Sequence, residues 1–177
     1  MDISMLGDVS DIVQLAIMCC DRPPKALAVE LGCSVSAIYE AIKGNKFIPV
    51  RAMKKFASVN LIAASAMAVQ VTGLSSLFGY RQCDRHIQSM LFELRTFDKR
   101  LNLELENLQE VILNKSSRDD LNASEIEYVC QTVAKMIERN NINFNVIMEF
   151  DRQFNLDIAE IEQKKKPQVL AHSRLQN

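Results

Sequence analysis

Tryptophan is absent from this chain, and glycine, proline and aromatic residues are scarce. Among 177 residues there are 5 Gly, 4 Pro and 6% aromatic residues, while Ala, Leu, Ile, Met, Glu and Lys are frequent. Glycine and proline mark turns and break helices, so their scarcity argues against many short strands joined by tight turns. The composition is that of an all-helical protein, and a hydrophobic content of 48% argues against disorder.

The cysteines lack the arrangements that form disulfide frameworks or zinc sites. Their number is odd and no pair shows C-x-x-C spacing: Cys19, Cys20, Cys33, Cys83 and Cys130. Such usage is typical of reduced thiols that act as small apolar residues in a cytoplasmic protein.

No targeting or membrane-spanning segment is indicated. Asp2, Asp8 and Asp11 come before the first basic residue, which is the wrong charge for a signal peptide. The most apolar run, residues 61–71, is shorter than the ~20 residues that cross a bilayer. We therefore expect a cytoplasmic protein with no membrane partner.

Motifs for catalysis are also missing. The sequence has no glycine-rich phosphate loop, no G-x-S-x-G and no H-E-x-x-H. Its two histidines, His86 and His172, are far apart and lack the spacing of metal ligands. We expect a protein that is not an enzyme, with no catalytic residue, no metal, no other cofactor and no small-molecule ligand.

What is present is a short helical pattern at residues 24–44. Apolar residues at helical spacing stand on both sides of Gly32: Leu27, Ala28 and Leu31 before it, and Val35, Ile38 and Ile42 after it. The spacing predicts two short helices joined by a tight turn. Where such helices cross steeply, Ala28 supplies the small residue at the contact and Gly32 tolerates positive φ at the corner. Ser34 is placed to cap the second helix.

This stretch resembles the helix-turn-helix of Cro/CI-type DNA-binding regulators. The resemblance rests on Ala28, Gly32, Cys33 and Ile38 and covers residues 21–57, roughly a fifth of the chain. An ordinary αα-hairpin, in which the same residues serve only packing, is the alternative interpretation.

Three neighbouring features favour the regulator. Prolines 23 and 24 suit the first turn of a helix. Residues 22–55 hold seven basic side chains against two acidic ones, a net charge of +5 in a chain of net charge −1. A further amphipathic helix is expected over residues 49–59. Its inward face would consist of Val50, Met53, Phe56 and Ala57.

The resemblance implies which residues would meet DNA. The second motif helix would enter the major groove and contact bases through Val35, Ser36, Tyr39, Glu40 and Lys43. Phosphates would be held by Lys25, Lys46, Arg51, Lys54 and Lys55. The helix lacks the Arg, Gln or Asn that often reads bases there, so binding as an oligomer becomes more necessary.

The rest of the N-terminal part fits a DNA-binding domain of four or five helices, residues 1–73. A first helix is expected over residues 10–20, packed across the motif. Residues 61–71 are rich in alanine and almost free of charge, which suits either a fifth helix of this domain or a contact between subunits.

The second half of the chain predicts a long antiparallel helical hairpin, residues 74–164. Over residues 75–114 apolar side chains recur in steps of three and four, as in one long helix. A polar linker follows, and Asn122 or Ser124 with Glu125 or Glu127 gives a capping box for a second long helix. An Asn-rich patch at 140–145 marks a place where that helix could bend or be interrupted.

Two helices of ~40 residues exceed the usual length, and we expect them to bury their seam against a second copy. The oligomer contacts would come from Ile87, Leu94, Phe97, Leu101, Leu108, Phe150 and Phe154. The alternative is that these residues form the core of a monomeric bundle. Residues 165–177 are expected to be a basic and polar tail without regular structure.

The sequence therefore predicts an all-α protein with an N-terminal helix-turn-helix domain and a C-terminal hairpin. Its layout is loosely similar to that of phage regulators of the CII-like kind, which implies a transcriptional regulator that binds double-stranded DNA as a homodimer or homotetramer. The alternative from another class is a helical interaction or scaffold protein whose helix-turn-helix serves packing.

Overall fold

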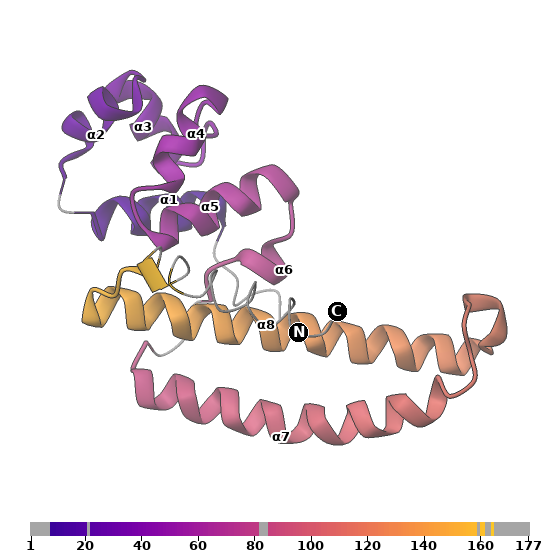
Figure 1. Cartoon of the computed structure of the whole chain (residues 1–177). Helices are drawn as coiled ribbons and strands as arrows, with labels where there is room; N and C mark the ends of the chain where they lie inside the picture. Colours follow the sequence, from indigo (N-terminus) through magenta and orange to yellow (C-terminus); the bar gives the residue numbers. More distant parts are fainter. Residues whose placement is uncertain (1–7, 21, 82–84, 159, 162–163, 165–177) are drawn as a thin grey trace.

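The computed structural model describes residues 8–20, 22–81, 85–158, 160–161 and 164, and its regular elements there are helical (Figure 1). In order they are α1 (Val9–Met18), α2 (Pro24–Leu31), α3 (Val35–Ile42), α4 (Val50–Ala57), α5 (Leu61–Thr72), α6 (Ser75–Phe78), α7 (Ile87–Val111), the 3₁₀ turn η2 (Arg118–Asp120) and α8 (Ala123–Phe154). The predicted all-α class is confirmed. The tail expected at 165–177 lies outside the described residues.

Short polar residues start several helices, as the sequence pattern suggests. Ser34 accepts a hydrogen bond from the backbone N–H of Ala37 (3.2 Å) and caps α3. Of the two alternatives for the last long helix, Asn122 and Glu125 form the capping box, with reciprocal bonds of 3.0 and 2.9 Å. These caps fix where α3 and α8 begin.

The first five helices share one apolar core. Its largest fully buried members come from four helices and the loop before α4: Ile12, Leu27, Ile38, Ile48 and Phe56. Burying side chains of this size contributes roughly 1.5–3 kcal/mol each. The expected inward position of Val50 is wrong, because α4 turns Ala52 and Phe56 inward and leaves Val50 largely exposed.

Helix α5 belongs to this core. It packs against α1 and α4 and buries most of its apolar side chains, among them Ile62, Ala66 and Met67. Asn60 connects α1 and α5, because its Nδ2 donates to the carbonyl of Ala16 (2.9 Å) while its Oδ1 caps α5. The apolar run at 61–71 is therefore a fifth helix of the domain.

The single helix expected over residues 75–114 is wrong. Helix α6 ends at Phe78, and α7 begins at Ile87. Between them Gly79 is buried in an extended conformation, and a Cβ there would lie 2.3 Å from the backbone oxygen of Ser75. The chain turns at a position where only glycine fits.

Helices α7 and α8 run side by side as an antiparallel hairpin, and α8 also contacts α6 and α5 (Figure 1). They have 25 and 32 residues, shorter than expected. The Asn-rich patch at residues 140–145 does not interrupt α8, which is continuous there. The amides of Asn141 and Asn145 bond to residues 79–81 and so do not break the helix.

Much of the apolar seam of α7 is used within the chain. Leu101, one of the expected oligomer contacts, is buried in the hairpin and cannot meet a second copy. Phe154 is exposed, and the remaining expected contacts are half-buried: Ile87, Leu94, Phe97, Leu108 and Phe150. Ion pairs join the two helices at Asp98–Arg139 (2.9 Å) and Glu104–Lys135 (2.6 Å).

The hairpin also packs against the N-terminal domain. Met148 of α8 is fully buried and belongs to the same core as Ile12 and Phe56.

In the described residues no helix combines the length and the apolar character needed to cross a membrane.

Candidate nucleic-acid interface

The turn between α2 and α3 has the geometry that the sequence predicts for a helix-turn-helix. Gly32 adopts the left-handed conformation (φ +66°), the N–H of Cys33 donates to the carbonyl of Ala28 (3.0 Å), and the N–H of Gly32 donates to that of Val29 (3.1 Å). These two bonds form a Schellman motif that ends α2. Ala28 and Ile38 are both buried in the apolar core to which the two helices contribute.

Helix α3 presents part of its expected base-contacting face to solvent. Ser36, Tyr39 and Lys43 are exposed, and Glu40 is half-buried. The Glu40 carboxylate accepts a hydrogen bond from the Asn45 side chain (3.2 Å). Val35 packs partly against the core, so less of it is available to touch a base than the sequence suggests.

The loop after α3 is fixed by contacts that the sequence did not indicate. The side-chain amide of Gln70, on α5, donates to the carbonyl of Ile48 (2.9 Å) and accepts from its N–H (3.1 Å). Gly44 adopts φ +73°, and a Cβ there would lie 3.2 Å from Ser10 Oγ. The loop that carries Lys46 is therefore held against α1 and α5.

Most of the expected phosphate-contacting cations are exposed and form no ion pair with another described residue. Lys25, Lys46, Arg51 and Lys54 are exposed, and none forms an ion pair within the part of the chain that the structure describes. Their helices and the α3–α4 loop lie at the end of the molecule remote from α7 (Figure 1). Unpaired cations beside an exposed helix face are what phosphate contacts require.

Two basic side chains of the +5 segment have protein partners. Arg22 pairs with Glu30 (2.5 Å), and Lys55 Nζ donates to the backbone carbonyl of Glu30 (3.2 Å). Lys55, expected on a phosphate, is thus directed towards the end of α2, although it remains exposed.

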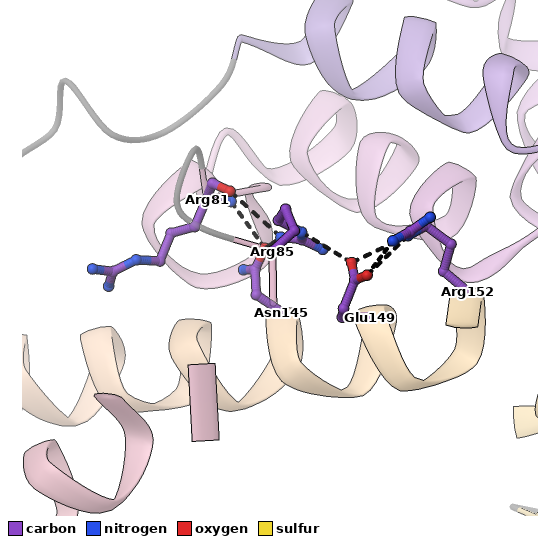
Figure 2. A network of polar contacts seen from close by, with 5 residues as sticks. All are labelled: Arg81, Arg85, Asn145, Glu149 and Arg152. Atoms are coloured by element: carbon purple, nitrogen blue, oxygen red, sulfur yellow. Dashed lines mark hydrogen bonds and ion pairs between the residues drawn. The ribbon is translucent and has the colours of Figure 1, made fainter. Parts of the chain in front are cut away.

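A second polar cluster, missed from the sequence, joins α8 to the segment that precedes α7 (Figure 2). Asn145 is fully buried; its Nδ2 donates to the carbonyls of Gly79 (3.1 Å) and Asn141 (2.9 Å), and its Oδ1 accepts from the N–H of Arg81 (2.9 Å). The available signal was the spacing of four between Asn141, Asn145 and Glu149, which places all three on one helix face.

Glu149 is the charged centre of this cluster, which we call the α8 polar network. Its buried carboxylate accepts from Arg85 Nε (3.0 Å) and Arg152 Nε (3.0 Å), while the Arg85 guanidinium lies over the Tyr80 ring at 4.2 Å. Burial alone would raise the pKa of Glu149, but the hydrogen bonds and charges of Arg152 and Arg85 outweigh it and lower that pKa. A carboxylate kept ionised by two guanidinium groups suits a structural connection better than proton transfer.

No family model matches this chain, and no match was found among curated proteins or solved structures. A function for this chain therefore has to come from its own residues and their geometry.

Proposed function

We propose that this chain is a regulator that binds double-stranded DNA through α3, as an oligomer. The observation that carries the proposal is the tight α2–α3 turn at Gly32, which presents Ser36, Tyr39 and Lys43 beside unpaired cations. A transcriptional role of the phage-regulator kind in the cytoplasm, and the absence of enzymatic activity, belong to the same proposal.

The mechanism divides affinity from selectivity. Lys25, Lys46, Arg51 and Lys54 would bind phosphates, which gives affinity and register but no sequence information. Selectivity would come from α3 in the major groove, where Ser36 can donate or accept a hydrogen bond and the Tyr39 ring and hydroxyl can contact base edges. With so few base-reading groups, one domain alone would discriminate weakly.

A helical interaction protein is the second candidate. Two large apolar side chains are exposed here, Phe47 in the loop before α4 and Val50 at the first residue of α4. They would suit a protein partner better than a phosphate backbone. In that case the cations nearby would contribute only to solubility.

The two candidates differ in their response to salt. Duplexes selected by the full chain from a random pool would be titrated by fluorescence anisotropy at several salt concentrations. We expect affinity to fall steeply with salt, and Lys46→Ala to lower the slope by about one unit for selected and scrambled duplexes alike. Tyr39→Ala should reduce the preference for the selected duplex instead.

Arg118→Ala is the matched control, since it also removes one exposed positive charge but lies in the turn between α7 and α8. It should leave the slope unchanged. Binding that does not depend on salt, or a Lys46→Ala effect no larger than that of Arg118→Ala, would contradict DNA binding through this face and favour the interaction protein.

A further inference from the structure

Helix α7 carries a line of exposed residues on its outer side. At 3.6 residues per turn they fall within an arc of about 80°, and we call them the α7 outer stripe: Phe92, Arg95, Lys99, Leu103, Glu106, Glu110 and, just past the helix end, Leu113. The side chains of Met90 and Leu101, buried in the hairpin, lie on the opposite side of the helix. The stripe therefore faces away from α8.

The stripe has no partner in the described part of the chain. Its three apolar side chains are among the most exposed of the molecule, with 73% of Phe92, 62% of Leu103 and 68% of Leu113 accessible. Its four charged side chains make no ion pair or hydrogen bond with another described residue. By contrast, Asp98 and Glu104, on the flanks of the same helix, are paired with α8.

The order of residues along the stripe is antisymmetric in charge and symmetric in apolar character. It reads apolar, two basic, apolar, two acidic, apolar, with Leu103 at the centre. If a second copy is laid antiparallel on the stripe, Phe92 meets Leu113, Arg95 meets Glu110 and Lys99 meets Glu106. The two Leu103 side chains then meet near the two-fold axis. Such a self-complementary surface is what a two-fold dimer contact requires.

We infer that the α7 outer stripe is the contact through which two copies of this chain pair, with their α7 helices antiparallel. The inference rests on the proposed function in one respect, the expectation of an oligomer. The paired length, from Phe92 to Leu113, is about 32 Å at 1.5 Å per residue. A parallel alignment would set Arg95 and Lys99 against their own copies, so like-charge repulsion selects the antiparallel arrangement.

This contact decides where the two DNA-binding domains lie. In Figure 1 the helices α2, α3 and α4 lie beyond α8, and α7 is the helix of the hairpin that lies farther from them. Pairing through the outer side of α7 therefore puts the two domains on opposite faces of the dimer. The dimer would bring together two separate duplex segments, rather than occupy adjacent half-sites one helical turn apart.

Exchange of charges tests the contact. The mass of the full chain would be followed by sedimentation velocity and light scattering across a dilution series, without DNA. The wild-type chain should dimerise, and Lys99→Glu or Glu106→Lys should each weaken association at least about tenfold, because each reversal makes two repulsive pairs by symmetry. The double variant Lys99→Glu/Glu106→Lys should regain wild-type association, because both pairs are restored with reversed sign.

Two variants serve as comparisons. Glu127→Lys reverses an exposed charge on α8 and should not change the mass, whereas Val71→Glu probes the exposed end of α5 as a competing contact. The inference is overturned by a monomeric wild-type chain, by single reversals without effect, by a folded double variant that stays dissociated, or by dissociation on Val71→Glu. Since DNA is absent from these measurements, such a result would leave the proposed DNA binding standing.

Discussion

Replacing Glu149 by Gln removes the charge at the centre of the α8 polar network while keeping the size of the side chain. The Glu149 side chain is 1% exposed, and its ion-pair partners Arg85 and Arg152 are 19% and 45% exposed. The substitution leaves two guanidinium groups facing a neutral amide whose N–H groups cannot accept their hydrogen bonds. The connection between α8 and the residues before α7 should therefore weaken.

The magnitude follows from the burial of the partners. Removing one member of a fully buried pair costs about 3–5 kcal/mol. Here Arg152 is partly solvated, and Arg85 keeps its bond to Asn145 Oδ1 (3.1 Å) and its contact with Tyr80. Discounting for both, we expect a loss of about 2–3 kcal/mol in the free energy of unfolding, which for a chain of this size lowers Tm by about 4–12 °C.

Urea unfolding followed by far-UV circular dichroism measures this loss. Glu127→Gln is the matched control, because Glu127 is exposed on the same helix, and it should not change stability measurably. A Glu149→Gln chain as stable as the control would refute the view that the network fastens α8 to the residues that precede α7.

The stability difference between the wild-type chain and Glu149→Gln should depend on pH. The pKa of Glu149 in the folded chain lies below its ordinary value of 4.5, so its ionised form is favoured by folding. Its contribution to stability is therefore present above pH 4.5 and is lost as the pH falls through the folded-state pKa. The difference between wild type and Glu149→Gln should be largest near neutral pH and shrink in acid.

Ala28→Glu should unfold the N-terminal domain, because it places a charge in the buried core, whereas Ala26→Glu, exposed on the same helix, should leave the helical circular dichroism intact. Gly44→Ala should destabilise by more than the ~1 kcal/mol expected for Gly32→Ala. Both positions have positive φ, but only Gly44 brings a Cβ against Ser10. Equal urea midpoints for the two glycine variants would contradict this reasoning.

The two short helices and the tight turn at Gly32 were predicted correctly because their determinants are local. Gly32 sets the turn, Ser34 caps the next helix, and Ala28 and Ile38 face the core, all within residues that are near neighbours in the chain. The capping box at Asn122 and Glu125 was equally readable, since a cap is decided within four residues.

The prediction of one helix over residues 75–114 was wrong because the contacts that decide the structure there come from residues distant in the sequence. Its period of three and four continues through Gly79, but the bonds that hold the chain there come from Asn141 and Asn145, more than sixty residues away. A separation of 22 residues likewise hid the role of Gln70, whose amide fixes the loop at Ile48. A local pattern carries no record of which distant amide will satisfy a buried carbonyl.

The sequence by itself determined the helical class, the position of the tight turn and the charge of the segment around it, because composition, periodicity and capping act over a few residues. Only the tertiary structure decided that Leu101 is buried within the hairpin, that Met148 packs into the N-terminal core, and that the α7 outer stripe remains exposed. An apolar period shows that a helix has a face to bury, but the element that covers this face is chosen by the packing of the whole chain.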